Sequence, residues 1–297
     1  MAEKYTYKDI RQSDSWFKFW EHLGWKRILF NPNISARVLN NIFGSSIVVE
    51  KPRNISQENL IEIESFAKAN KTVYLQIKPG LSQTDDLFEK NNYEYITKPN
   101  GVTKTGIINL QSPLDNLFKN FSYRVRHLIK TSSAKTKINI KNNPTASEIE
   151  EFYQVYRQGG LSKKFFTYSE SAFRAFRESF KNNCFLCSVK SVDNKYLGGC
   201  VFVFEGKTVW YIFSALNENG RKLDAGYAML WQGMGLLKNK GFEFLDLDGL
   251  YDERYPDSFS GHQGYTEFKL HFRPEIVYFP KIRVKYFNKI YRLLDKI

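Results

Sequence analysis

The order of predicted helices and strands repeats along this chain, and the repeat constrains its fold more than any other feature. In each half, helices are followed by strands, a long helix and a further strand. The second half shows it best, with strands at 184–189, 197–205 and 208–214, a helix over 223–239 and a strand at 242–247. A chain of 297 residues has room for two average domains. The sequence therefore predicts two mixed α/β domains.

The first half carries the same signals. Apolar periodicity predicts helices over 14–23 and 56–70, and apolar runs predict strands at 45–50 and 72–78. The clearest helix spans 112–131, where seven apolar residues follow helical spacing. Its other side is basic, so we expect this helix to bury one face and expose the other.

Three further segments define boundaries. The polar run 131–136 is predicted to separate the domains. Ser147 and Glu150 have the spacing of a capping box, which predicts a helix start at Ser147. The tail, 281–297, is predicted to be an amphipathic helix with a basic face. Such a helix would lie on the anionic inner surface of a membrane or pack against a domain, and packing is favoured.

The net charge of +13 indicates an anionic partner, such as a nucleic acid, a nucleotide sugar or the inner membrane surface. The charge is concentrated. Residues 119–141 hold seven Lys or Arg and no acid, and 281–297 hold six against one Asp. These clusters predict local anion binding, although a solvated basic surface would have the same composition.

The chain reads as a soluble, cytoplasmic protein. It has no apolar run long enough to span a membrane and no secretory signal at its start. Cys184 and Cys187 have CxxC spacing but lie in an apolar strand-like run, so they are predicted to be buried structural cysteines. The acids of 246–261 lack the spacing of a calcium loop, because Gly249 comes too early. No metal is therefore expected.

The segment 264–272, GYTEFKLHF, is the best candidate for chemistry. Its polar and apolar residues alternate, which predicts a strand with Tyr265, Glu267, Lys269 and His271 on one face. It follows the long polar loop 246–261, and such loops often carry ligand sites. Lys269 would then face a cleft, although an exposed strand lysine would show the same pattern.

Several short motifs, in this order, resemble the Fem family of non-ribosomal peptidyltransferases, which have an acetyltransferase-like (GNAT-like) fold. The resemblance spans nearly the whole chain, and its most specific element is Phe268-Lys269-Leu270-His271-Phe272. The other motifs are Gln12-Ser13-Asp14-Ser15-Trp16, the helix segment 122–130, Trp210-Tyr211, Ala225-Gly226-Tyr227-Ala228 and Leu245-Asp246-Leu247-Asp248-Gly249.

The resemblance implies two tandem acetyltransferase-like domains, with the C-terminal helix returning to the first and no coiled-coil arm. On this basis the first domain would comprise 1–132 and 276–297, and the second 133–275. The implied activity moves an amino acid from aminoacyl-tRNA to an amine of a peptidoglycan precursor and uses no cofactor. A monomer is favoured.

The resemblance also assigns site residues. The lysine of the family's FK element falls on Lys269, where an ammonium would stabilise the oxyanion that forms when an amine attacks an ester. Two basic residues that family members use against a nucleotide-sugar phosphate fall on Trp20 and Ser162, so the acceptor is less well defined than the reaction. The remaining substrate-binding candidates are Phe268, Tyr227, Tyr211, Arg221, Lys222, Arg124 and Arg126.

Two other classes of function remain open. One is a coenzyme A-dependent N-acyltransferase, although the usual pyrophosphate signature is absent around 219–225. The other is a non-catalytic basic protein that binds RNA or a membrane surface. Neither Ser–His–Asp catalysis nor a phosphate-binding loop has a matching motif.

Overall fold

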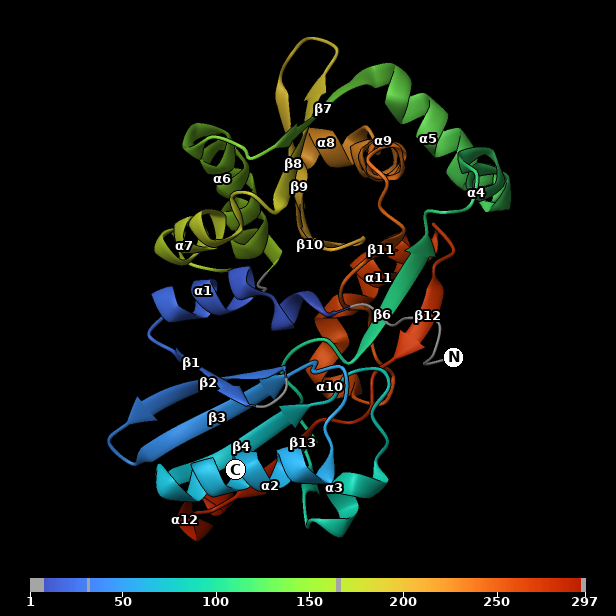
Figure 1. Cartoon of the computed structure of the whole chain (residues 1–297). Coiled ribbons are helices and arrows are strands. Elements are labelled where there is room, and N and C mark those ends of the chain that lie inside the picture. The colour runs from blue at the N-terminus through green and yellow to red at the C-terminus, as the bar shows by residue number, and fades with distance from the viewer. Residues whose placement is uncertain (1–7, 31–32, 164–166, 295–297) are drawn as a thin grey trace. The chain divides into compact units, whose positions relative to one another are not determined.

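The computed structural model describes residues 8–30, 33–163 and 167–294 (Figure 1). Its contacts form two compact units. The first comprises 1–103, 252–258 and 278–297, and the second 104–251 and 259–277. Both units are mixed α/β structures, so the predicted fold class is confirmed.

The first unit is built on a six-stranded sheet with the order β1-β2-β3-β4-β13-β5. Neighbouring strands are antiparallel except β3 and β4, which are parallel and joined by helix α2. Helices α1 and α2 lie on opposite faces of this sheet (Figure 1). The elements are α1 Asp14–His22, β1 Lys26–Phe30, β2 Ile34–Asn41, β3 Gly44–Glu50, α2 Gln57–Ala69, β4 Thr72–Lys78, α3 Asp86–Lys90, β5 Glu94–Tyr95, β13 Arg283–Tyr286 and α12 Lys289–Leu294.

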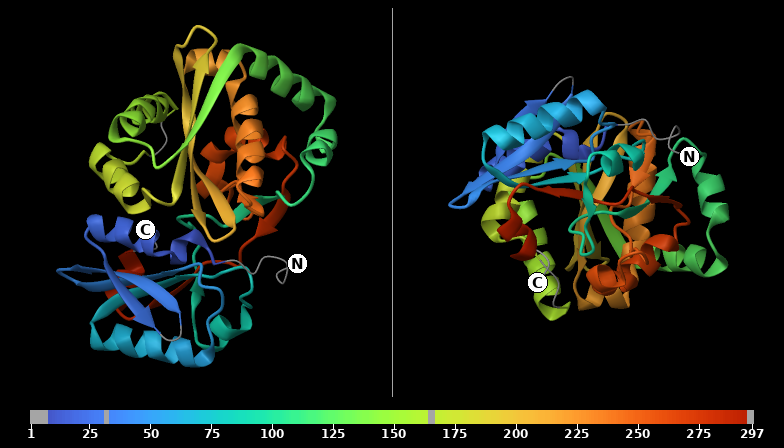
Figure 2. Two further views of the ribbon diagram at one scale, coloured as in Figure 1. Left: turned by 45° about the horizontal axis from the view of Figure 1, so that its top comes forward. Right: turned by 90° about the horizontal axis from the view of Figure 1, so that it is seen from below.

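The second unit has a seven-stranded sheet with the order β12-β6-β11-β10-β9-β8-β7. Helices α6 and α7 cover one face, and α5 and α9 cover the other (Figure 2). The elements are β6 Lys104–Asn109, α4 Leu114–Asn120, α5 Tyr123–Lys135, β7 Thr136–Asn142, α6 Ala146–Lys163, α7 Glu170–Phe180, β8 Cys184–Ser191, β9 Tyr196–Glu205, β10 Thr208–Leu216, α8 Glu218–Lys222, α9 Ala225–Asn239, β11 Phe244–Asp246, α10 Pro256–Phe259, α11 Gln263–Leu270 and β12 Glu275–Tyr278. Of these, α10 belongs to the first unit except for its last residue.

Strands β8, β9 and β10 form the antiparallel centre of this sheet, close to the predicted ranges. Cys184, Cys187 and Cys200 are buried and free, which agrees with a structural role. Burial raises the pKa of the Cys184 thiol to about 12, so this side chain stays neutral and packs as a small apolar group.

The predicted helix over 112–131 is two helices in the structure. Phe121 has an extended backbone and ends α4, and the Ser122 hydroxyl accepts a hydrogen bond from the Val125 amide and starts α5. The apolar pattern continues across the break because both helices pack on the same core. Periodicity therefore predicted the buried face correctly but missed the N-cap at Ser122.

The helix predicted to start at Ser147 begins one residue earlier, at Ala146. The capping box is formed by Thr145 and Glu148, since the Thr145 hydroxyl accepts from the Glu148 amide and the Glu148 carboxylate accepts from the Thr145 amide. The motif is present, shifted by two residues from the predicted pair.

The prediction of a strand over 264–272 is wrong, because this segment forms helix α11. The same residues also fit a helix, since Phe268 and Phe272 stand four positions apart and both contact Tyr227 on α9. Tertiary packing on α9 selects the helix, and alternation over nine residues is too short to exclude it.

The predicted helix over 281–297 is also wrong in its first part. Residues Arg283–Tyr286 form β13, which pairs with β4 and β5, and within the described part of the tail, 281–294, the helix is limited to Lys289–Leu294. The segment does return to the first unit, but as a strand. Arg283 is fully buried there, pairs with Asp85 and stacks on Tyr95.

The contacts divide the chain near residue 104, whereas the predicted boundary lay near 132. Strand β6 pairs with β11, and α5 packs on α9, so this segment groups with the second unit. The polar run 131–136 is the end of α5 and the start of β7, where Ser132 and Thr136 hydroxyls bond to backbone carbonyls one turn earlier.

Candidate active site

The candidate site is organised by the turn that follows β11. The Asp246 carboxylate is buried and accepts hydrogen bonds from the Thr105 hydroxyl and from the Asp248 amide, the latter at 2.8 Å. Asp248 and Gly249 both adopt left-handed backbone conformations, with φ of 47° and 74°. This pair of unusual conformations turns two successive carbonyl groups toward the side chain of Lys269.

Lys269 is 6% exposed, and its Nζ donates to the carbonyl oxygens of Asp248 at 2.6 Å and Gly249 at 2.8 Å. Burial lowers the pKa of this ammonium to about 8, against the opposing charges of Asp248 and Asp246. An ammonium has three N–H donors. Two are used by the carbonyls, so the third can donate to a substrate oxygen.

Aromatic rings and an imidazole surround this ammonium. Its Nζ lies 4.7 Å from the ring centroid of Tyr265 and 5.9 Å from that of Tyr211. The ring of His262 contacts Tyr265, with centroids 4.9 Å apart. Burial, and then the charge of Lys269, lower the pKa of His262. The site thus holds a cation beside a neutral imidazole, and sequence motifs gave no signal for His262.

A second cluster fixes helix α11 against α9. Phe268 packs on Tyr227 with ring centroids 5.2 Å apart, and the Tyr227 hydroxyl bonds to His271 Nδ1 at 2.8 Å. A Cβ at Gly226 would lie 3.3 Å from the Phe268 ring. This glycine therefore lets Phe268 approach the start of α9, and the contact sets the position from which Lys269 extends.

Two of the basic candidates lie on α5 and two on α8. Arg126 donates to the carbonyl oxygens of Lys119 and Phe121, so it secures the end of α4. Arg124 is exposed on α5. Arg221 donates to the Leu216 carbonyl.

Lys222 forms an exposed ion pair with Glu218 at 2.7 Å. None of the hydrogen bonds or ion pairs described for these basic residues reaches Lys269. The structure therefore brings together Lys269 with Tyr211, and Phe268 with Tyr227. The charge of Arg124 acts on Tyr227, where it opposes the rise in pKa that burial causes, whereas Arg126, Arg221 and Lys222 have no described contact with either group.

The two positions that replace the family's phosphate-binding residues have ordinary local contacts. The Arg37 guanidinium lies over the Trp20 ring, 4.0 Å from its centroid. The Ser162 hydroxyl donates to the Gly159 carbonyl within α6. Trp20 thus has a cation above it, whereas Ser162 has none among its described contacts.

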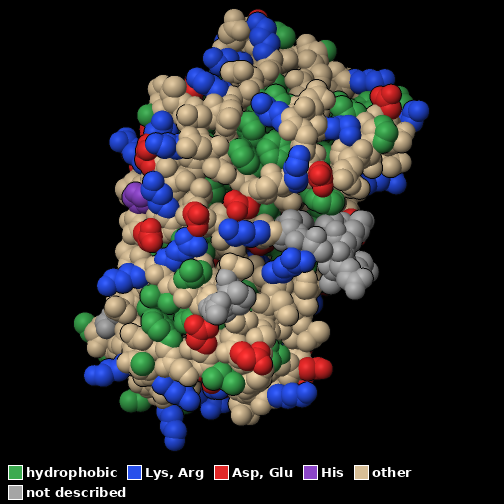
Figure 3. All heavy atoms as spheres, in the orientation of Figure 1, with side chains coloured by type: hydrophobic (Ala, Val, Ile, Leu, Met, Phe, Trp, Pro, Cys, Tyr) green, Lys and Arg blue, Asp and Glu red, His purple; other side chains and the backbone are tan. Residues whose placement is uncertain are grey.

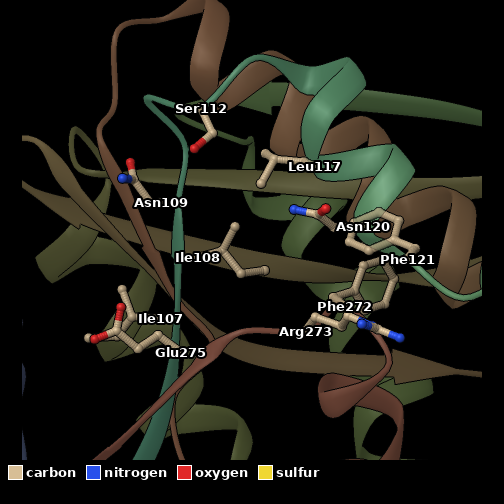
Figure 4. Close-up of a pocket in the computed structure, with 10 residues that line it drawn as sticks. All are labelled: Ile107, Ile108, Asn109, Ser112, Leu117, Asn120, Phe121, Phe272, Arg273 and Glu275. Carbon is tan, nitrogen blue, oxygen red and sulfur yellow. The ribbon is translucent and has the colours of Figure 1, made fainter.

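A cavity of about 330 Å³ opens beside the end of α11 (Figure 4). The rings of Phe121 and Phe272 and the side chains of Ile108 and Leu117 form its apolar wall, and amide and charged groups stand around it (Figure 4). Its lining residues are Ile107, Ile108, Asn109, Ser112, Leu117, Asn120, Phe121, Phe272, Arg273 and Glu275. The cavity lies next to the end of the helix that carries Lys269.

Comparisons with known proteins bear on this arrangement. Residues 188–293 match the FemAB family model. The match includes β9, β10, α9 and the Lys269 helix, so the resemblance to the Fem family is confirmed over the segment that holds the candidate site. A search of curated proteins gave no match by sequence.

Solved structures resemble the chain in fold. FemX gives a TM-score of 0.78 at 14% identity, covering 99% of this chain and 96% of that one. L-PGS from Bacillus licheniformis gives 0.62 at 11% identity, with coverages of 93% and 89%. A tandem GNAT protein from the clavulanic acid biosynthesis pathway gives 0.52 at 8% identity, with coverages of 85% and 78%. The chain therefore has a tandem GNAT-like fold.

The FemAB match and this fold support an aminoacyltransferase enzyme, as the motifs predicted. In the parts of the chain that the structure describes, no helix has the length and apolar character needed to cross a membrane.

Proposed function

We propose that this chain transfers an amino acid from aminoacyl-tRNA to an amine of a peptidoglycan precursor. The FemAB match supports the class of reaction. The observation that carries the proposal is Lys269, a buried ammonium held by two backbone carbonyls. Among the residues described, no carboxylate forms an ion pair with it, so its charge is available to a substrate.

The reaction forms a C–N bond and breaks an ester C–O bond. The acceptor amine attacks the ester carbonyl carbon, and the carbonyl oxygen becomes an oxyanion. The third N–H of Lys269 donates to this oxygen, and the interaction is stronger for the oxyanion than for the neutral carbonyl. As the intermediate collapses, the ribose oxygen leaves and takes the proton from the attacking nitrogen.

The surroundings of Lys269 make this stabilisation effective. Lys269 is itself only 6% exposed, and the buried Tyr211 ring and the 38% exposed Tyr265 ring lie beside its ammonium. Desolvation raises the pKa of both phenols, so both stay neutral. In a site with little water, a fixed ammonium stabilises developing charge more strongly than in solution. The left-handed turn at Asp248 and Gly249 holds the ammonium in place before substrate binds.

The test is a transfer assay with tRNA charged with labelled amino acids and a precursor peptide. We expect Lys269→Met to lower the rate about 10²- to 10³-fold, as for loss of an oxyanion donor, while the circular dichroism spectrum is retained. Lys181→Met, an exposed lysine after α7, should keep the wild-type rate. Equal rates for wild type and Lys269→Met would refute the role of this lysine.

Mass spectrometry of cell-wall precursors, with and without the protein, tests the acceptor. A mass shift by one amino-acid residue would identify the amino acid and the acceptor together. Unchanged precursors, together with transfer to another amine in vitro, would retain the reaction and reject peptidoglycan as the acceptor.

The fold also supports a second candidate, a coenzyme A-dependent N-acyltransferase, because the chain resembles a tandem GNAT protein. The segment before α9 disfavours this candidate. Asp224 is left-handed, and the Arg221 and Lys222 side chains are engaged by Leu216 and Glu218. Tight binding of acetyl-coenzyme A in calorimetry would favour the coenzyme A-dependent activity over transfer from aminoacyl-tRNA.

A further inference from the structure

The exposed face of α5 and the end of α4 carry a row of cations. Val125 and Ile129 of α5 are buried in the core, which leaves Arg124, Lys130 and Lys135 exposed on the opposite side. Lys119, at the end of α4, is exposed as well. We call these four side chains the α5 basic row. Within the described residues none of the four forms an ion pair.

Residues 119–141 contain no Asp or Glu, and the nearby acid on α4, Asp115, forms no ion pair with the row among the described residues. Figure 3 shows Lys and Arg side chains along the edge of the molecule over α4 and α5. An uncompensated row on a regular helix attracts a polyanion and is sensitive to salt. It is therefore a docking surface for a chain of phosphates.

The same face presents an aromatic surface suited to nucleobases. Tyr123 is 78% exposed and stacks on His127, with ring centroids 6.4 Å apart and planes 16° from parallel. Exposed rings between cations are typical of proteins that bind single-stranded nucleic acid. A helix that binds membranes would expose Leu, Phe or Trp between its cations. The exposed residues of α5 include none of these.

The cavity lies at the same end of α5. Asn120 and Phe121, which line it, come directly before the cap of α5. Its Phe121 and Phe272 rings pack edge to face and are only 3% and 2% exposed, so they form an apolar floor. The side-chain amides of Asn109 and Asn120 can bond to the polar edges of a base (Figure 4). Hydrogen bonds to base edges are one way in which proteins hold an unpaired base.

We propose that RNA lies along the α5 basic row and inserts an unpaired base into the cavity beside Phe121 and Phe272. This inference rests on the proposed function, in which RNA carries the aminoacyl group. Phe272 follows Lys269 by less than one helical turn, so a base in the cavity would bring the end of the RNA close to the helix that bears the reacting ammonium.

The first test measures binding of an uncharged fluorescent RNA hairpin with a short unpaired 3′ end, by anisotropy over a range of salt. We expect Arg124→Glu with Lys130→Glu to weaken binding about tenfold or more. The slope of log K against log salt should also flatten, by roughly 0.7 to 0.9 for each phosphate that the variant no longer neutralises. The matched control is Arg157→Glu with Lys181→Glu. These residues are exposed on α6 and after α7, on the other face of the sheet, and the pair should bind like wild type.

A second variant tests the cavity. Asn120 is exposed, so Asn120→Trp should fold and obstruct the opening. We expect it to remove the preference for the hairpin with an unpaired end over a blunt one, while the salt dependence stays that of wild type. An unchanged preference would reject the base site.

Equal weakening by the α5 pair and the control pair would overturn the inference. So would selective binding to phosphatidylglycerol vesicles with no binding to RNA. These results are independent of transfer. If RNA binding behaves as expected but no charged tRNA supports transfer, the proposed function fails and the RNA surface stands. If transfer proceeds but the α5 variant pair binds RNA like wild type, the proposed function stands and the RNA surface is rejected.

Discussion

Two buried lysines, Lys78 in the first unit and Lys269 in the second, differ in what holds them. In the first unit, Lys78 Nζ contacts Glu50 Oε1 at 3.1 Å, and Arg37 contacts the other oxygen of the same carboxylate. In the second unit, Lys269 contacts two neutral carbonyl groups. A carboxylate thus pairs directly with the first lysine, whereas backbone carbonyls contact the second, and the charges of Asp248 and Asp246 act on it without an ion pair among the described residues. This difference favours a structural role for Lys78 and supports the role that we propose for Lys269.

The largest expected effect comes from removing the carboxylate of the first cluster. Burial raises the pKa of Glu50, but the charges of Arg37 and Lys78 outweigh it and hold that pKa well below its usual range. Glu50→Gln leaves two buried cations without their partner, and we expect unfolding free energy to fall by about 3 to 5 kcal/mol. Denaturant unfolding measures this. Glu21→Gln, exposed on α1, is the control and should change little.

Removing the charge of Lys269 in the second unit should increase stability, whereas Glu50→Gln in the first unit should decrease it. Burial lowers the pKa of Lys269 to about 8 from 10.5, so the unfolded chain binds more protons between these values. Stability should therefore rise as pH increases from 8 to 10.5, by up to about 3 kcal/mol. Lys269→Met should remove this rise and increase stability at pH 7. A variant less stable than wild type at pH 7 would show that the ammonium holds the turn together.

The transfer rate should fall as Lys269 loses its proton, whereas stability rises. If the charged form of Lys269 stabilises the oxyanion, the transfer rate is full below pH 8 and falls as pH rises through that value. The pH profile of kcat measures this decrease. Retention of the rate to pH 10 would mean that the charge of Lys269 is not used.

The position of Lys269 depends on the close contact between α11 and α9, which a smaller change can test. Gly226→Ala places a methyl group 3.3 Å from the Phe268 ring. We expect it to cost roughly 1 to 3 kcal/mol by overpacking and to lower the transfer rate. Gly235→Ala in the same helix is the matched control. Its new methyl would meet only Leu114, at 3.7 Å, and should be neutral or stabilising.

The two clusters also differ in how far sequence predicts them. Periodicity and turn signals gave β3, β4 and the β8–β10 antiparallel strands, because these strands bury whole apolar runs. The hairpin of β1 and β2 was missed. Arg27 and Arg37 interrupt its apolar pattern, and both find partners only after folding, Arg27 on Asp14 and Arg37 on Glu50.

In the second unit, sequence pointed to Lys269 but not to its surroundings. The acids of this loop were considered as metal ligands and rejected, and no signal indicated that the backbone carbonyls of Asp248 and Gly249 would hold the lysine. No local sequence pattern predicts that two successive residues adopt the left-handed backbone conformation. His262 was passed over because it belongs to no motif, and only the fold of α11 brings its ring to Tyr265. The spacing of residue types along the sequence does not predict contacts made by backbone atoms or between helices.

The smallest expected effect measures the charge of Lys269 directly. Burial and the nearby ammonium both lower the pKa of His262. Removing the charge by Lys269→Met should raise the pKa of His262, because one of the two causes that lower it is gone. Histidine side-chain NMR across the titration measures the shift, and Lys222→Met, whose cation is paired with Glu218, is the control and should leave it unchanged. An unshifted His262 in Lys269→Met would mean that the ammonium does not act on its neighbours. The functional difference that we draw between Lys78 and Lys269 would then be rejected.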